Sequence, residues 1–120
     1  MTRMDEETRL AAVEARLRAI LEPYRDRLEE GQIYGVSVLR RPGVKAHDWF
    51  AGVQPVNGAV KLNLLPMHAH PEILDGISPE LRSRKTGASV FRFAALDDRL
   101  LADLESLVAR AFDAYSQSPR

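Results

Sequence analysis

The chain has 120 residues, 45% of them hydrophobic, no cysteine, and 17 basic residues balanced by 17 acidic ones. This length predicts a single domain over residues 1–120 with one hydrophobic core. The absence of cysteine excludes disulfides, thiolate metal sites and a cysteine nucleophile. The N-terminus is polar, and no apolar run approaches the ~20 residues that a membrane helix needs. We therefore expect a cytoplasmic protein without a signal peptide or a membrane span.

The charges are unevenly distributed along the chain. Residues 1–31 carry six Arg against eight acidic residues, residues 32–94 carry eight basic residues against four acidic ones, and residues 95–120 carry three against five. The basic middle is either the solvated outside of a sheet or a surface that faces an anionic ligand or partner. Nucleic-acid-binding domains are usually basic overall, so the zero net charge argues against nucleic acid as the partner.

Apolar residues spaced three and four apart predict a helix over residues 4–30. Gly31 is a natural stop after this helix. Pro23 would remove a backbone hydrogen bond within the helix, so we expect a kink, or two helices that meet near Glu22.

Strands are expected at residues 32–40, 46–54 and about 59–65. Between the last two strands, Asn57-Gly58 suits a type I′ turn, which matches the twist of a hairpin. With these as the two loop residues, the predicted opposed pairs are Val56 with Ala59, Val53 with Leu62, and Ala51 with Leu64.

This register sorts the side chains of the hairpin onto two faces. The apolar face would hold Trp49 with Ala51 and Val53. The mixed face would hold Phe50 and Lys61 with Leu65. An exposed Phe50–Leu65 patch would indicate a homodimer contact or the floor of a ligand site, unless the N-terminal helix covers it.

Beyond the hairpin, proline and glycine punctuate short helices at residues 71–76 and 78–86, the second with Ser78 as its N-cap. A last strand at 88–94 and an amphipathic helix at 96–115, with Asp97 as its N-cap, complete the chain. The fold class is therefore α+β: a small antiparallel sheet of about four strands, packed with the N- and C-terminal helices, in the order α-β-β-β-α-α-β-α.

Five short motifs occur in series: LLP at 64–66, HPEIL at 70–74, ISPEL at 77–81, KTG at 85–87 and VFRF at 90–93. In this series the chain resembles the YdhG-like family of bacterial domains of unknown function, over about residues 33–115. The resemblance implies a compact α+β domain with an antiparallel sheet. One branch of the family looks like frataxin-type iron chaperones, which use a carboxylate-rich ridge. Here the acidic residues are spread without a dense cluster, which is a departure from that pattern.

His68 and His70 form the first candidate site. On an extended segment, residues two apart point the same way, so the two imidazoles could share iron or another divalent metal. A third ligand would be needed, such as His47 or Glu72. The alternative is that His70 caps the next helix and His68 is a polar surface residue.

Arg82, Arg84 and Lys85 form the second candidate site, before Gly87. Together with Lys61 they could hold a phosphate or a carboxylate. The alternative is that they stabilise the C-terminal end of a short helix through its dipole.

None of the common catalytic sequence motifs occurs in the chain, so no catalytic residues are predicted. The leading expectation is a binding or accessory domain for an anionic small ligand or a protein partner. The alternative is metal handling through His68 and His70. An uncharacterised enzyme is the third hypothesis.

Overall fold

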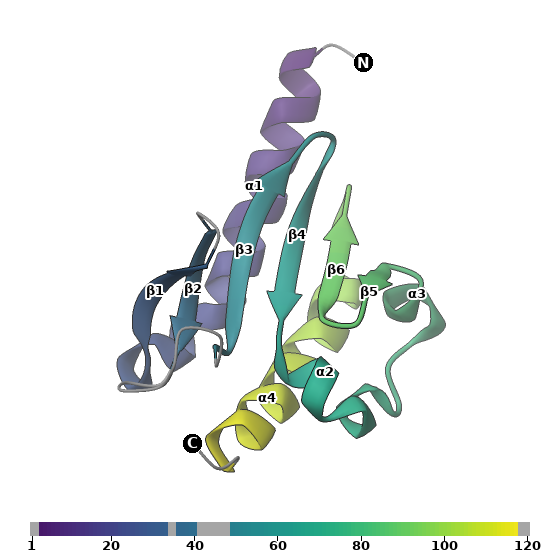
Figure 1. Ribbon diagram of the computed structural model, residues 1–120. Helices are drawn as coiled ribbons and strands as arrows, with labels where there is room; N and C mark the ends of the chain where they lie inside the picture. Colours follow the sequence, from purple (N-terminus) through teal and green to yellow (C-terminus); the bar gives the residue numbers. More distant parts are fainter. Residues whose placement is uncertain (1–2, 34–35, 41–48, 118–120) are drawn as a thin grey trace.

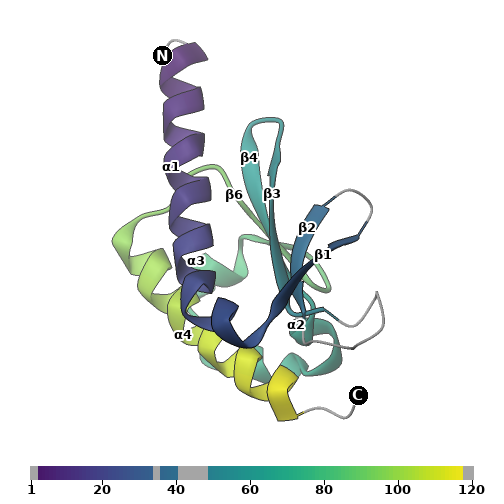
Figure 2. The same cartoon turned by 90° about the vertical axis from the view of Figure 1, so that its left-hand side faces the viewer.

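The computed structural model describes residues 3–33, 36–40 and 49–117. These residues form a six-stranded antiparallel sheet with the strand order β1-β2-β3-β4-β6-β5. The long helices α1 and α4 lie on one side of the sheet (Figures 1 and 2). The elements are α1 (Arg3–Leu21), the 3₁₀ helix η1 (Glu22–Arg27), β1 (Glu29–Ile33), β2 (Val36–Arg40), β3 (Ala51–Val56), β4 (Ala59–Leu64), α2 (Pro66–Ala69), the 3₁₀ helix η2 (Pro71–Leu74), α3 (Pro79–Arg82), β5 (Lys85–Gly87), β6 (Val90–Phe93) and α4 (Asp98–Gln117).

The predicted α+β class is confirmed, and the predicted number of about four strands is too low. The two additional strands are β1 and β5, both at the edges of the sheet. None of the described helices is long and apolar enough to cross a membrane.

The N-terminal helix ends earlier than predicted, at Leu21 rather than near residue 30. Pro23 lies in the first turn of η1, where its missing amide hydrogen costs no helical hydrogen bond. The predicted break near Glu22 is therefore confirmed, but the chain continues as a six-residue 3₁₀ helix and then as a strand.

The predicted strand over residues 32–40 is in fact parts of two antiparallel strands. Strand β1 pairs with β2, with Gly31 opposite Val38. A Cβ atom at Gly31 would lie 2.9 Å from the Cζ atom of Arg40. Gly31 is therefore a strand residue that leaves room for the Arg40 side chain, and not the end of a helix.

The β3–β4 hairpin has the predicted register. Gly58 adopts a φ of 78°, as the turn requires. The opposed pairs are Val56 with Ala59, Val53 with Leu62, and Ala51 with Leu64, as predicted. Local turn chemistry therefore determines the centre of the sheet.

The connection from β4 to β6 contains α2, η2 and α3, which all pack against α4. The amide of Leu81 donates to the hydroxyl oxygen of Ser78 at 3.1 Å, so Ser78 is the helix cap that the sequence predicts. The second short helix is shorter than predicted: α3 ends at Arg82, and the chain then forms β5.

The core lies between the sheet and the two long helices, and Phe50 belongs to it. This side chain is fully buried, whereas Trp49 is only half-buried. The Phe50 ring contacts Phe112 and Tyr115 of α4 and Tyr24 of η1, with centroid distances of 5.3, 5.6 and 5.8 Å. Phe50 is therefore covered, as the alternative to an exposed patch expected, and α4 covers it together with η1. Strand β3 begins only at Ala51, so the strict alternation of faces does not extend to residue 50.

Candidate functional site

We call the side of the sheet that faces away from α1 and α4 the open face (Figure 2). Phe91 and Phe93 of β6 are fully buried on the helix side, so Arg92 between them points to the open face. Arg92 lies opposite Lys61 of β4, and Lys61 lies opposite Gln54 of β3. Directly opposed residues share a face, so two cations are neighbours here.

Arg84 lies on the other side of Arg92 from Lys61, directly before β5, and adds a third cation next to these two. The amide of Arg92 donates to the carbonyl oxygen of Arg84 at 2.8 Å, just before β5 begins. The side chains of Arg84 and Arg92 are exposed, and that of Lys61 is half-buried. We call Lys61, Arg92 and Arg84 the basic row.

Arg92 is held by the tip of the hairpin. Its Nη2 atom donates a hydrogen bond of 3.1 Å to the carbonyl oxygen of Asn57. A guanidinium has five N–H donors, so most of them stay free for a ligand. The contact holds the guanidinium at the hairpin tip and reduces the rotamer entropy that binding would cost.

The basic row lacks the carboxylates that neutralise other cations of the chain. Within the described residues, no ion pair involves Lys61, Arg84 or Arg92. Near the hairpin tip, a Cβ atom built on Gly58 would lie 3.9 Å from both Arg92 Nη2 and Glu6 Oε1. The row is therefore a concentrated positive charge that ends close to one carboxylate.

The other predicted basic residues lie elsewhere. Lys85 lies opposite Phe91, so it is on the helix side of the sheet and across from the face of Lys61. Arg82 donates from Nη2 to the carbonyl oxygen of Leu74 at 3.0 Å, which ties α3 to η2. The predicted grouping of Lys61, Arg82 and Lys85 is not present, and only Lys61 and Arg84 of the predicted bases lie together.

The two histidines are not on an extended segment, which corrects the predicted geometry. His68 is an exposed residue of α2, and His70 follows that helix. The Nδ1 atom of His70 lies 3.4 Å from Oε1 of Glu72. In the described part of the chain, no group of three or more His, Asp or Glu residues is placed to hold a metal ion, and His47 lies outside that part.

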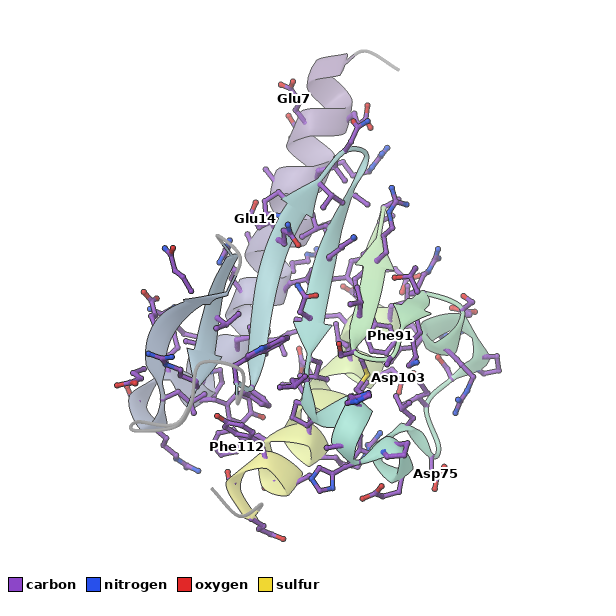
Figure 3. All side chains as sticks on the ribbon, in the orientation of Figure 1. Glu7, Glu14, Asp75, Phe91, Asp103 and Phe112 are labelled. Atoms are coloured by element: carbon purple, nitrogen blue, oxygen red, sulfur yellow. The ribbon has the colours of Figure 1, made fainter. Side chains whose placement is uncertain are left out.

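No residue of the basic row lines any of three hollows that described residues form. One lies between α1 and the tip of the β3–β4 hairpin, where Glu7 and Glu14 lie along the helix (Figure 3). The largest, a groove of about 430 Å³, lies between α1, η1 and α4 and includes Tyr24 and Glu105. Burial raises the pKa of the Tyr24 phenol, and the Asp113 carboxylate adds to this increase.

Arg92 is the member of the basic row that sequence reasoning missed. It lies in the predicted last strand, within the VFRF motif, and alternation with the two phenylalanines would place it on the polar face. Its neighbours follow only from the pairing of β6 with β4, which no local pattern specifies. That pairing brings Arg92 to Lys61.

A scan of protein-family models found no match to the chain, and searches of curated proteins and of solved structures likewise found none. The resemblance to the YdhG-like family therefore stays a prediction.

Proposed function

We propose that this protein is a small binding domain whose basic row holds an anionic ligand or partner. The observation that carries the proposal is the direct opposition of Lys61 and Arg92 without a carboxylate partner in the described residues. Like charges opposed across a sheet destabilise it by roughly 0.2–1 kcal/mol. A bound anion would offset this repulsion, which gives the arrangement a functional reason.

The chemistry of the row suits oxyanions. Guanidinium groups bind carboxylate and phosphate oxygens through paired hydrogen bonds, and ammonium groups add a compact charge. Gln54 and Asn63 flank Lys61 along the open face and could add amide donors. No step of bond making or breaking is needed, which agrees with the absence of a recognisable catalytic motif in the sequence.

Titration of the full chain with sodium tripolyphosphate, followed by calorimetry, tests the proposal. Lys61→Gln and Arg92→Gln should each weaken binding about tenfold, the loss expected for one charge-assisted hydrogen bond. Lys85→Gln is the matched control, because it removes a lysine from the helix side of the neighbouring strands. Equal losses in all three variants would contradict the proposed function.

Metal handling is the second candidate function, and the contact between His70 and Glu72 favours it. Imidazole and carboxylate groups are both ligands of iron and other divalent metals, and here one of each lies side by side. Native mass spectrometry with and without chelator tests this candidate. Stoichiometric metal that is lost in His70→Ala but kept in Arg82→Ala would support it, and no retained metal after loading with iron(II) or zinc would reject it.

A further inference from the structure

We infer that the partner of the basic row is an acidic segment of another protein, and not a small anion. This inference rests on the proposed function and names the class of its partner. Three observations carry it: the row stands outside the hollows described above, it is short, and the described residues of β3, β4 and β6 beside it on the open face include no aromatic side chain.

The position of the row argues against a small ligand. Sites for small molecules are concave and bury most of the ligand surface. Arg84 and Arg92 are exposed on the outside of the sheet, and the three hollows are lined by other residues. An anion on this surface would be contacted from one side only. A protein partner can supply the other side and exclude water from the contact.

The dimensions of the row suit a few neighbouring carboxylates. Adjacent strands are about 5 Å apart, so three cations on three strand positions span roughly 10 Å. Acidic side chains two apart on an extended segment are about 7 Å apart, so two or three of them cover the row. The amides of Gln54 and Asn63 beside the row can bond the backbone of such a segment.

The surroundings disfavour nucleic acid. Single-stranded nucleic acids bind sheets by stacking bases on aromatic side chains. The register of β3, β4 and β6 places Gly52, Gln54, Lys61, Asn63, Val90 and Arg92 on the open face. None of them is aromatic. A longer polyanion that ran past the hairpin tip would also meet Glu6.

Fluorescence anisotropy of the full chain with three labelled probes tests the inference. The probes are a twelve-residue peptide of alternating Glu and Ser, a terminally labelled tripolyphosphate and a twelve-nucleotide oligouridine. We expect the peptide to bind at least tenfold more tightly than either other probe. Lys61→Gln, Arg84→Gln and Arg92→Gln should each weaken it about tenfold, and Lys85→Gln should leave it within twofold.

The outcomes separate this inference from the proposed function. Tighter binding of tripolyphosphate or oligouridine that still depends on Lys61 and Arg92 would overturn the acidic segment and leave an anion site in place. No binding of any probe would overturn both. If Lys85→Gln weakened peptide binding as much as the three substitutions in the basic row, the binding would depend on net charge alone. This result would also overturn the inference.

Discussion

Four arginines in one region of this molecule are paired with carboxylates, whereas three cations in another region are not paired with a carboxylate of any described residue. From α1 to β2, Arg16, Arg18, Arg25 and Arg40 each lie within 3.6 Å of a carboxylate oxygen. From β4 to β6, the three cations of the basic row lie beside one another, and no ion pair is formed by them with any described residue. We expect the first arrangement to stabilise the fold and the second to cost stability. Other arginines, such as Arg9 and Arg110, donate to backbone carbonyl oxygens instead of pairing with a carboxylate of a described residue. The direct opposition of Lys61 and Arg92 is therefore what distinguishes the basic row.

The strongest test of this comparison is truncation of a paired cation. The Arg40 side chain is only 25% exposed, lies over Gly31, and has its Nε atom 3.4 Å from Oε1 of Glu29. Arg40→Ala removes both the packing of the stem and the ion pair, so we expect a loss of about 1–2 kcal/mol in the free energy of unfolding. Urea denaturation measures this. Arg84→Ala is the control from the basic row, and a comparable loss there would break the comparison.

Charge reversal in the basic row should raise the free energy of unfolding rather than lower it. Lys61→Glu places a carboxylate opposite Arg92, so the free energy of unfolding should rise by roughly 0.2–1 kcal/mol while binding of anions is lost. In the double variant Lys61→Glu with Arg92→Gln, the free energy of unfolding should no longer show this increase. A variant that becomes less stable on reversal would show that the two side chains do not repel each other in the folded protein.

Salt should reduce the effects that charge substitutions in the two regions have on the free energy of unfolding, and these effects are smaller than those above. Arg18 and Glu14 form an i,i+4 pair at 2.8 Å, for which Arg18→Gln should cost about 0.3–0.5 kcal/mol at low salt. Lys61→Gln should stabilise the protein by a similar amount under the same conditions. In 1 M sodium chloride, both differences should shrink, because the Debye length falls to about 3 Å. Differences that persist unchanged would point to packing rather than charge.

The smallest effect is expected at Tyr24, in the groove between the helices. Its pKa is raised from 10.0 by burial and then by Asp113. The folded state therefore holds this proton more tightly than the unfolded state, and stability decreases as the pH rises above 10. Tyr24→Phe keeps the ring contact with Phe112 and removes the titration. The stability difference between the two proteins should shift between pH 9 and pH 11.5 in urea titrations, and a constant difference would contradict the assignment.

The sequence predicted those elements that depend on neighbouring residues. The turn at Asn57-Gly58 determined the register of β3 and β4, and Ser78 capped its helix as expected. Asp97 likewise accepts a hydrogen bond of 2.8 Å from the amide of Leu100 at the start of α4. These features follow from side chains that are close in the chain.

The features that were missed depend on distant residues. Strand β1 begins with Glu29-Glu30-Gly31, which has little intrinsic strand preference, and it is a strand because β2 pairs with it. Phe50 is buried because η1 and α4 surround the point where β3 begins. Of the basic row, Lys61 and Arg84 were predicted and Arg92 was missed, since Arg92 reaches Lys61 only through the pairing of β6 with β4.

The strand order also has a consequence for folding kinetics. Among the described strands, β1 to β4 pair in sequence order, as do β5 and β6, and only the contact of β4 with β6 joins strands that are not consecutive. Its formation closes the loop over residues 65–89, which costs more chain entropy than a hairpin turn. Lys61 and Arg92 meet at this junction. Their repulsion should therefore oppose the step with the largest loop-closure cost, and removing it by Lys61→Gln should speed folding if that junction is formed in the transition state.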